Sequence, residues 1–150
     1  MTSALNEIYD AIASWEVYWD EDIPIGTREI QSMKAFTGTP EMPIRILNLI
    51  DPETSGADGF VGLGRTKVVV WNIIDTLYIR PTAHGGQIRR STPQLANYIK
   101  TYITAMQNDR SPTSQSWIEE MTWQLGTFEY PGSELCYGVK VNLEVHEVIS

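Results

Sequence analysis

The sequence has very few of the residues that usually carry out chemistry. Its single cysteine, Cys136, cannot form an internal disulfide and supplies no set of metal ligands. The two histidines, His84 and His146, have no carboxylate or cysteine at the spacing of a metal site. We therefore expect no metal, no cofactor and no catalytic residue, so the protein is predicted not to be an enzyme. We also expect the chain to fold in a reducing compartment such as the cytoplasm.

Positive charge is scarce as well. Eleven Lys and Arg residues stand against 19 Asp and Glu residues, for a formal net charge of −8. Proteins that bind DNA or an anionic membrane need a cationic surface, so both functions are disfavoured. No apolar run approaches the roughly 20 residues that span a bilayer, and the first residues lack the order of a signal peptide. These absences predict a soluble protein that is not exported.

The chain does have enough apolar material for a packed core. Its 150 residues, 42% of them hydrophobic, match the size of one ordinary domain. A domain of this length buries about 70% of the surface that its unfolded chain exposes, so it needs no disulfide to be stable. We expect a single domain over residues 1–150.

Apolar spacing predicts two principal helices. The first covers residues 3–19 and should end in the acidic run 20–22; its stripe is Leu5, Ile8, Ile12, Trp15 and Trp19. The second begins at Ser91, where Gln94 completes a capping-box pattern, and ends at residues 108–109. Its predicted buried stripe is Leu95, Ile99, Tyr102, Ile103 and Met106.

Strands are predicted at residues 28–36, weakly, and at 44–50, 67–80, 117–130 and 135–148, the last two forming a hairpin. The strand over 67–80 is apolar at both parities, which predicts cover on both faces, by its own domain alone or also by a neighbouring subunit. The fold class is therefore α+β: a mainly antiparallel sheet with two principal helices packed on it and a long loop between the central strands.

That loop, residues 53–66, contains four glycines and few large side chains, so it is predicted to be a long, mobile hairpin loop. Its glycines resemble a phosphate-binding loop only superficially, because strand 67–80 follows where such a loop requires a helix. A second connector, residues 81–90, carries two glycines and ends in Arg89 and Arg90. Nucleotide binding is disfavoured.

Carboxylates and tryptophans offer no site either. Glu119 and Glu120 are adjacent on a strand, so they point to opposite faces and cannot flank one substrate bond. Trp15, Trp71 and Trp123 lie on apolar faces and are predicted core residues. The remaining two tryptophans, near the ends of elements, are the better candidates for contacts: Trp19 and Trp117. These features favour a subunit that works by assembly.

The order of the predicted elements resembles the tail terminator proteins of long-tailed bacteriophages. The residues that carry the resemblance are an amphipathic N-terminal helix, a strand, a glycine loop, the strand VVVWNIIDTLYIRP at 68–81, a helix with Tyr98 and Tyr102, and a closing strand YGVKV at 137–141. The pattern also fits the related head-to-tail joining and head completion proteins. It covers most of the chain and includes no catalytic motif.

The resemblance implies a virion protein, made in the host cytoplasm, that forms a homohexameric ring on the tail tube. Such a ring ends polymerisation of the tube and joins the tail to the head, so the implied partners are other copies, the tail tube protein and the head completion or connector protein. Genomic DNA would pass through the lumen without specific binding, and no membrane is involved. An acidic lumen would keep that DNA unbound, so we expect carboxylates to outnumber basic residues on the inner wall.

A ring requires heterologous contacts, in which one patch meets a different patch on the next copy. The predicted contact residues lie in the glycine loop and in the second connector: Gly56, Asp58, Phe60, Arg65, His84, Arg89 and Arg90. Two other classes stay open. One is an enzyme or small-molecule binder with a pocket under the glycine loop, and the other is an acidic adaptor that mimics nucleic acid.

Overall fold

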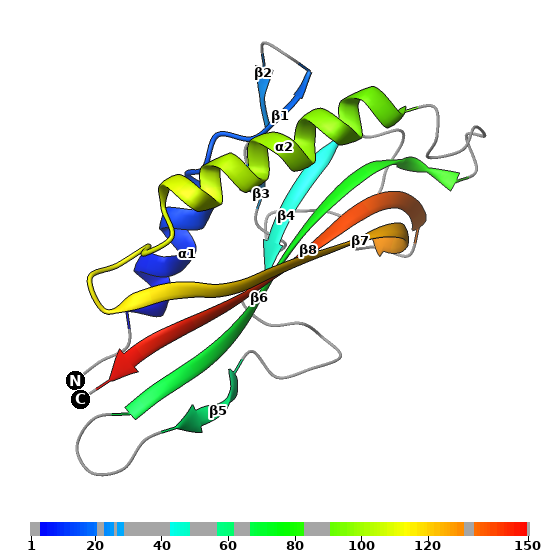
Figure 1. The fold of residues 1–150 in the computed structure, drawn as a ribbon. Helices are drawn as coiled ribbons and strands as arrows, with labels where there is room; N and C mark the ends of the chain where they lie inside the picture. Colours follow the sequence, from blue (N-terminus) through cyan, green and yellow to red (C-terminus); the bar gives the residue numbers. More distant parts are fainter. Residues whose placement is uncertain are drawn as a thin grey trace.

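The structure, a computed structural model, describes residues 4–20, 23–25, 27–28, 43–48, 57–61, 67–82, 91–130 and 134–149. Its main element is a twisted six-stranded sheet (Figure 1). The strand order is β3 (Thr27–Arg28), β4 (Ile44–Asn48), β6 (Lys67–Pro81), β8 (Glu134–Ile149) and β7 (Ser116–Tyr130), with β5 (Ala57–Val61) also paired to β6. Only the short β3–β4 pair is parallel, which confirms a mainly antiparallel sheet.

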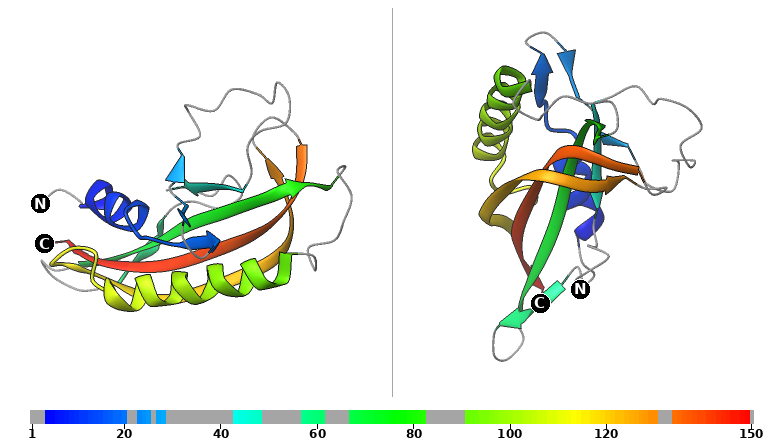
Figure 2. Two further views of the ribbon diagram at one scale, coloured as in Figure 1. Left: turned by 90° about the horizontal axis from the view of Figure 1, so that it is seen from above. Right: turned by 90° about the vertical axis from the view of Figure 1, so that its right-hand side faces the viewer.

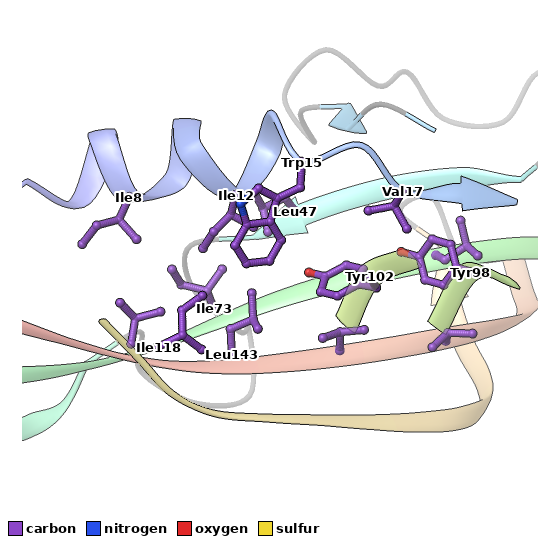
Figure 3. Close-up of a cluster of buried hydrophobic side chains, with 14 of the residues drawn as sticks. Ile8, Ile12, Trp15, Val17, Leu47, Ile73, Tyr98, Tyr102, Ile118 and Leu143 are labelled. Atoms are coloured by element: carbon purple, nitrogen blue, oxygen red, sulfur yellow. The ribbon is translucent and has the colours of Figure 1, made fainter. Parts of the chain in front are cut away.

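Two helices pack on one face of this sheet (Figure 2). They are α1 (Leu5–Ala13) and α2 (Thr92–Asn108), and a small second sheet of β1 (Tyr18–Asp20) and β2 (Ile23–Pro24) lies beside α2. The core between helices and sheet is built from both layers, as Figure 3 shows for Ile8, Ile12, Tyr98, Ile73 and Leu143. The α+β prediction is confirmed.

The central strand β6 is buried on both of its faces at its middle. Ile73 and Leu77 point into the helix-side core, whereas Tyr78 joins a second cluster on the opposite face with Ile44, Ile46 and Cys136. The predicted double cover is therefore present within the chain itself. It follows from the near-continuous apolar sequence of β6, which leaves neither face suited to water.

Helix α1 is shorter than the sequence pattern predicts, because it ends at Ala13 and not near Trp19. Trp15 and Val17 are still buried, but they alternate along an extended segment that leads into β1. Aromatic and β-branched residues in this segment disfavour a helix. Trp15 and Trp19 are four residues apart, which fits one face of a helix, but with Val17 between them they also fit one face of a strand. The guanidinium of Arg45 meets the backbone carbonyls of Ile12 and Trp15 where the helix stops.

The second helix begins after Ser91 and ends at Asn108, as predicted, but its predicted capping box is absent because no side chain caps the first turn. The predicted terminal hairpin is confirmed by the pairing of β7 with β8. Within the predicted loop 53–66, residues 57–61 instead form strand β5, on the stretch of β6 that β4 leaves unpaired. The weak strand 28–36 overlaps only β3; the rest of it lies outside the described residues.

Candidate functional site

Helix α2 has a core face and a flank with different exposure. Leu95, Tyr98 and Tyr102 recur at spacings of three and four and are buried against the sheet. The predicted stripe is therefore wrong in part, because Tyr98 takes a place in it. Three of its predicted members are only half-buried: Ile99, Ile103 and Met106. The flank of α2 thus offers apolar side chains that the core covers only in part.

Strand β7 supplies the facing apolar surface. Its Trp123 and Leu125 are 47% and 50% exposed, the largest exposed apolar side chains on the strand. The prediction that Trp123 belongs to the core is wrong, because β7 is the last strand of the sheet and the core beneath α2 is filled by β6 and β8.

Between the flank of α2 and this part of β7 lies a groove of about 660 Å³, which we call the α2–β7 groove. Its described lining is apolar except for two threonines and one cation: Thr92, Leu95, Ala96, Ile99, Lys100, Ile103, Thr104, Trp123 and Leu125. Lys100 is thus the one charged residue among the described residues of the lining. The groove can receive an apolar segment that carries a negative charge.

The groove runs beside an open edge of the sheet. Strand β7 pairs with β8 on one side, and no other described strand pairs with it. Apart from Ile118, whose N–H and C=O bond to Arg110, β7 therefore presents backbone N–H and C=O groups along its outer edge, which is the usual template for a strand from another chain. An apolar groove and an unpaired strand edge thus coincide at one surface.

A buried ion pair lies on the inner side of the same helix. The Arg45 guanidinium donates from Nη2 to Asp75 Oδ2 at 2.7 Å and from Nε to Oδ1 at 3.1 Å, and both side chains are fully buried. The Tyr102 hydroxyl donates to the same Oδ2 at 2.7 Å. Together with the bonds to the carbonyls of Ile12 and Trp15, the pair joins α1, α2, β4 and β6.

Burial and charge shift the ionisation of this cluster. Burial opposes the charged form of Arg45, but Asp75, Tyr102 and Tyr98 together outweigh it, so the pKa of Arg45 is raised. Burial, with Asp75 as the next cause, raises the pKa values of Tyr98 and Tyr102 well above normal. Both phenols therefore stay neutral, and the Tyr102 hydroxyl donates to Asp75. The cluster links α1, α2, β4 and β6 and fixes the inner face of α2.

The predicted contact residues are described only in part. Asp58 and Phe60 lie in strand β5, so they belong to a paired strand and not to an irregular loop. The other predicted contact residues lie outside the described residues: Gly56, Arg65, His84, Arg89 and Arg90.

Sequence reasoning missed both the groove and the buried pair. A charged residue inside each of two apolar strands, Arg45 in β4 and Asp75 in β6, is a signal of an internal pair, since a buried charge needs an opposite partner. The groove has a weaker signal in the sequence. Leu95, Ile99 and Ile103 recur every four residues, which makes the apolar surface of α2 wider than the face that packs on the core.

The remaining candidates have structural surroundings. The ring of Trp117 lies 5.5 Å from that of His146, whose Nε2 is 3.2 Å from a Glu144 carboxylate oxygen. Cys136 is fully buried. Within the described ranges, no three histidine, cysteine or carboxylate side chains gather where they could hold a metal ion. Neither described helix has the length and apolar character that crossing a membrane requires.

Comparison of the chain with protein-family models and with curated proteins finds no match.

Proposed function

We propose that this chain is a structural subunit that assembles into a homohexameric ring at the head-proximal end of a bacteriophage tail tube. There it ends polymerisation of the tube and joins the tail to the head connector. The observation that supports assembly is the coincidence of the apolar α2–β7 groove with the open edge of β7. The tail-terminator role rests on the resemblance in element order noted above.

The physical reason is the cost of leaving such a surface in water. Trp123 and Leu125 are each about half exposed although both side chains are large and apolar. The edge of β7 beyond Ile118 is available to pair with a strand of another chain. A partner that covers both gains from apolar burial and from backbone hydrogen bonds at once. A ring of identical copies meets this need on every subunit.

Within the ring, the proposed role needs no catalytic residue, metal or cofactor. Other copies, the tail tube protein and the head completion or connector protein are the proposed partners. The net charge of −8 suits a channel for DNA, because like charge keeps the duplex from binding to the wall. A map of the assembled ring should show more carboxylates than basic residues on its inner wall, and a strongly cationic channel would contradict this part of the proposal.

Purified chain should be examined by size-exclusion chromatography with light scattering and by electron microscopy, alone and after addition of tail tubes. We expect six-membered rings with a central hole, free or on one tip of each tube. The matched control is the variant with Trp123→Asp, which should stay folded by circular dichroism and remain monomeric. A wild-type chain that stays monomeric and leaves tube tips bare would refute the ring.

Two alternatives are tested in the same experiment. A head completion or neck adaptor protein would form rings that bind the head connector and leave tube tips free. A small-molecule binder is favoured by one observation, because the apolar α2–β7 groove has a volume typical of ligand pockets, which is about 300–1,000 Å³. A stable monomer whose tryptophan fluorescence responds to an apolar ligand, and loses that response in Trp123→Asp, would support this second function.

A further inference from the structure

Lys100 is an exposed cation that forms no ion pair with any described residue. It is also the one charged residue in the described lining of the α2–β7 groove. A second hollow of about 390 Å³ also borders Lys100, and the carboxylates in its lining accept hydrogen bonds from Tyr18 and Trp15 instead: Glu16 and Asp109. Lys100 is therefore a positive charge, beside apolar surface, that is available to a carboxylate from outside the chain.

Another copy of this chain can supply that carboxylate. Among the described residues, two exposed side chains are basic, Lys100 and Arg110, and Arg110 donates to the Ile118 carbonyl. Six exposed side chains are acidic: Glu7, Asp10, Glu16, Glu119, Glu120 and Glu129. The surface that a second copy presents is thus mainly acidic, which makes it complementary to Lys100.

Strand β7 determines the form of the occupant. The chain itself closes the outer edge at Ile118, whose N–H donates to the Arg110 carbonyl at 2.8 Å. Beyond Ile118 the edge has no partner among the described strands, so it can pair with an extended backbone. Trp123 and Leu125 need an apolar side chain from the same segment. The occupant that fits is an extended segment with one apolar and one acidic side chain.

A groove-to-groove contact between two copies does not fit. Two-fold antiparallel pairing of the uncharged stretch 121–127 would be centred on Gln124, so it would place Glu119 of one copy opposite Glu129 of the other. It would also bring two Lys100 ammonium groups to one apolar enclosure, with no acidic residue in the described lining. Charge therefore favours a contact between unlike surfaces.

We infer that each copy inserts an extended segment from outside its own groove into the α2–β7 groove of the neighbouring copy. There the segment pairs with the edge of β7 beyond Ile118, and its carboxylate pairs with Lys100. Such a contact is heterologous, so its repetition around an axis closes a ring. The inference rests on the proposed ring, since a chain that does not assemble has no neighbouring copy.

A mixing experiment separates this contact from a self-complementary one. Trp123→Asp blocks the groove but leaves the inserted segment intact, so the variant alone should be a monomer near 17.0 kDa. Mixed in excess with the wild type, it should fill every wild-type groove and give 1:1 dimers by native mass spectrometry. A self-complementary contact would give no mixed dimer, because it needs two intact grooves.

Gln124→Asp is the matched control for this mixture. Gln124 is exposed on the same strand, but it alternates with Trp123 and Leu125 and is absent from the groove lining. The variant should form rings alone and should enter wild-type rings when mixed. Circular dichroism should match that of the wild type for every variant.

A series at Lys100 tests for the carboxylate. Lys100→Met should raise the protein concentration needed for half-maximal ring assembly by about tenfold, because it leaves the incoming carboxylate unpaired against apolar surface. Lys100→Arg keeps the charge and should assemble like the wild type. A purely apolar occupant predicts the opposite for Lys100→Met, which would then assemble at lower concentration than the wild type.

Hydrogen exchange tests the strand pairing. Ring assembly should slow exchange of backbone amides in the stretch 121–127, where the edge of β7 gains a partner. The Ile118 amide provides an internal control, because it already donates to Arg110 within one copy and should not change.

The outcomes distinguish this contact from the proposed function. Wild-type rings combined with any of four results would overturn the contact and leave the ring standing: rings in Trp123→Asp, no mixed dimer, tighter assembly of Lys100→Met, or unchanged exchange at 121–127. A wild-type chain that remains monomeric, alone and with tail tubes, would overturn the ring and this contact together.

Discussion

Replacing Asp75 by Asn should destabilise the fold by about 3–5 kcal/mol, the usual cost of leaving one buried charge without its partner. The structure gives the reason, because the Arg45 guanidinium has no exposed surface and its two shortest side-chain bonds are to Asp75. The amide would still accept the Tyr102 hydroxyl, so the loss isolates the ionic contact. For a domain with a total stability of about 5–15 kcal/mol, the change is large.

The assay is urea unfolding followed by tryptophan fluorescence and by circular dichroism. Arg45→Met should cost a similar amount, and the double variant should be more stable than the sum of the two single losses by about 1–3 kcal/mol. Glu144→Gln is the matched control, because this carboxylate lies 3.2 Å from His146 and is partly exposed. Its effect should stay within about 0.5 kcal/mol.

Strict additivity of Arg45→Met and Asp75→Asn would refute the reasoning, as would a cost for Asp75→Asn no larger than that of Glu144→Gln. Either result would mean that the pair is not shielded from water in solution. Native hydrogen exchange provides an independent measurement, since loss of the pair should also speed exchange in α1, whose Ile12 carbonyl accepts from Arg45.

Three further outcomes are expected. Gly138→Ala should lower the free energy of unfolding, measured in urea, by about 1–3 kcal/mol, because a Cβ there would overlap a β6 carbonyl oxygen. Gly126→Ala should be neutral, since the nearest contact of its Cβ would be 3.8 Å away. The pKa values of Tyr98 and Tyr102 are raised in the folded state, so stability should be constant below about pH 10 and should fall above it. The ionisation of both phenols, followed by absorbance at 295 nm, should therefore coincide with unfolding. Glu147→Gln should lower the free energy of unfolding in urea by about 1–3 kcal/mol. This buried carboxylate accepts the backbone N–H that precedes α1 and lies near a tryptophan indole N–H. An unchanged urea midpoint would contradict that role.

Local periodicity was enough to predict the long strands and α2. The strand predicted over 67–80 is observed at Lys67–Pro81, and that predicted over 135–148 at Glu134–Ile149. Alternating or continuous apolar residues over a dozen positions leave few ways to bury them, so neighbouring residues alone determine such elements. The same holds for the end of α2 at 108–109.

Features that depend on distant residues could not be predicted in this way. The end of α1 depends on Arg45, which is far along the chain, because its guanidinium donates hydrogen bonds to the carbonyls of Ile12 and Trp15. The exposure of Trp123 depends on strand order, since the same apolar strand placed between β6 and β8 would be core. The α2–β7 groove combines both dependencies and has no local motif.

The charge pattern of β7 supports a specific partner over uncontrolled association. Exposed edge strands normally carry charges that prevent aggregation, and β7 has Glu119 and Glu120 near one end and Glu129 near the other. The stretch 121–127 between them carries no charge and includes both apolar side chains of the groove. Pairing is thus limited to a window the length of a short strand, because a longer strand would have to pass the carboxylates at its ends.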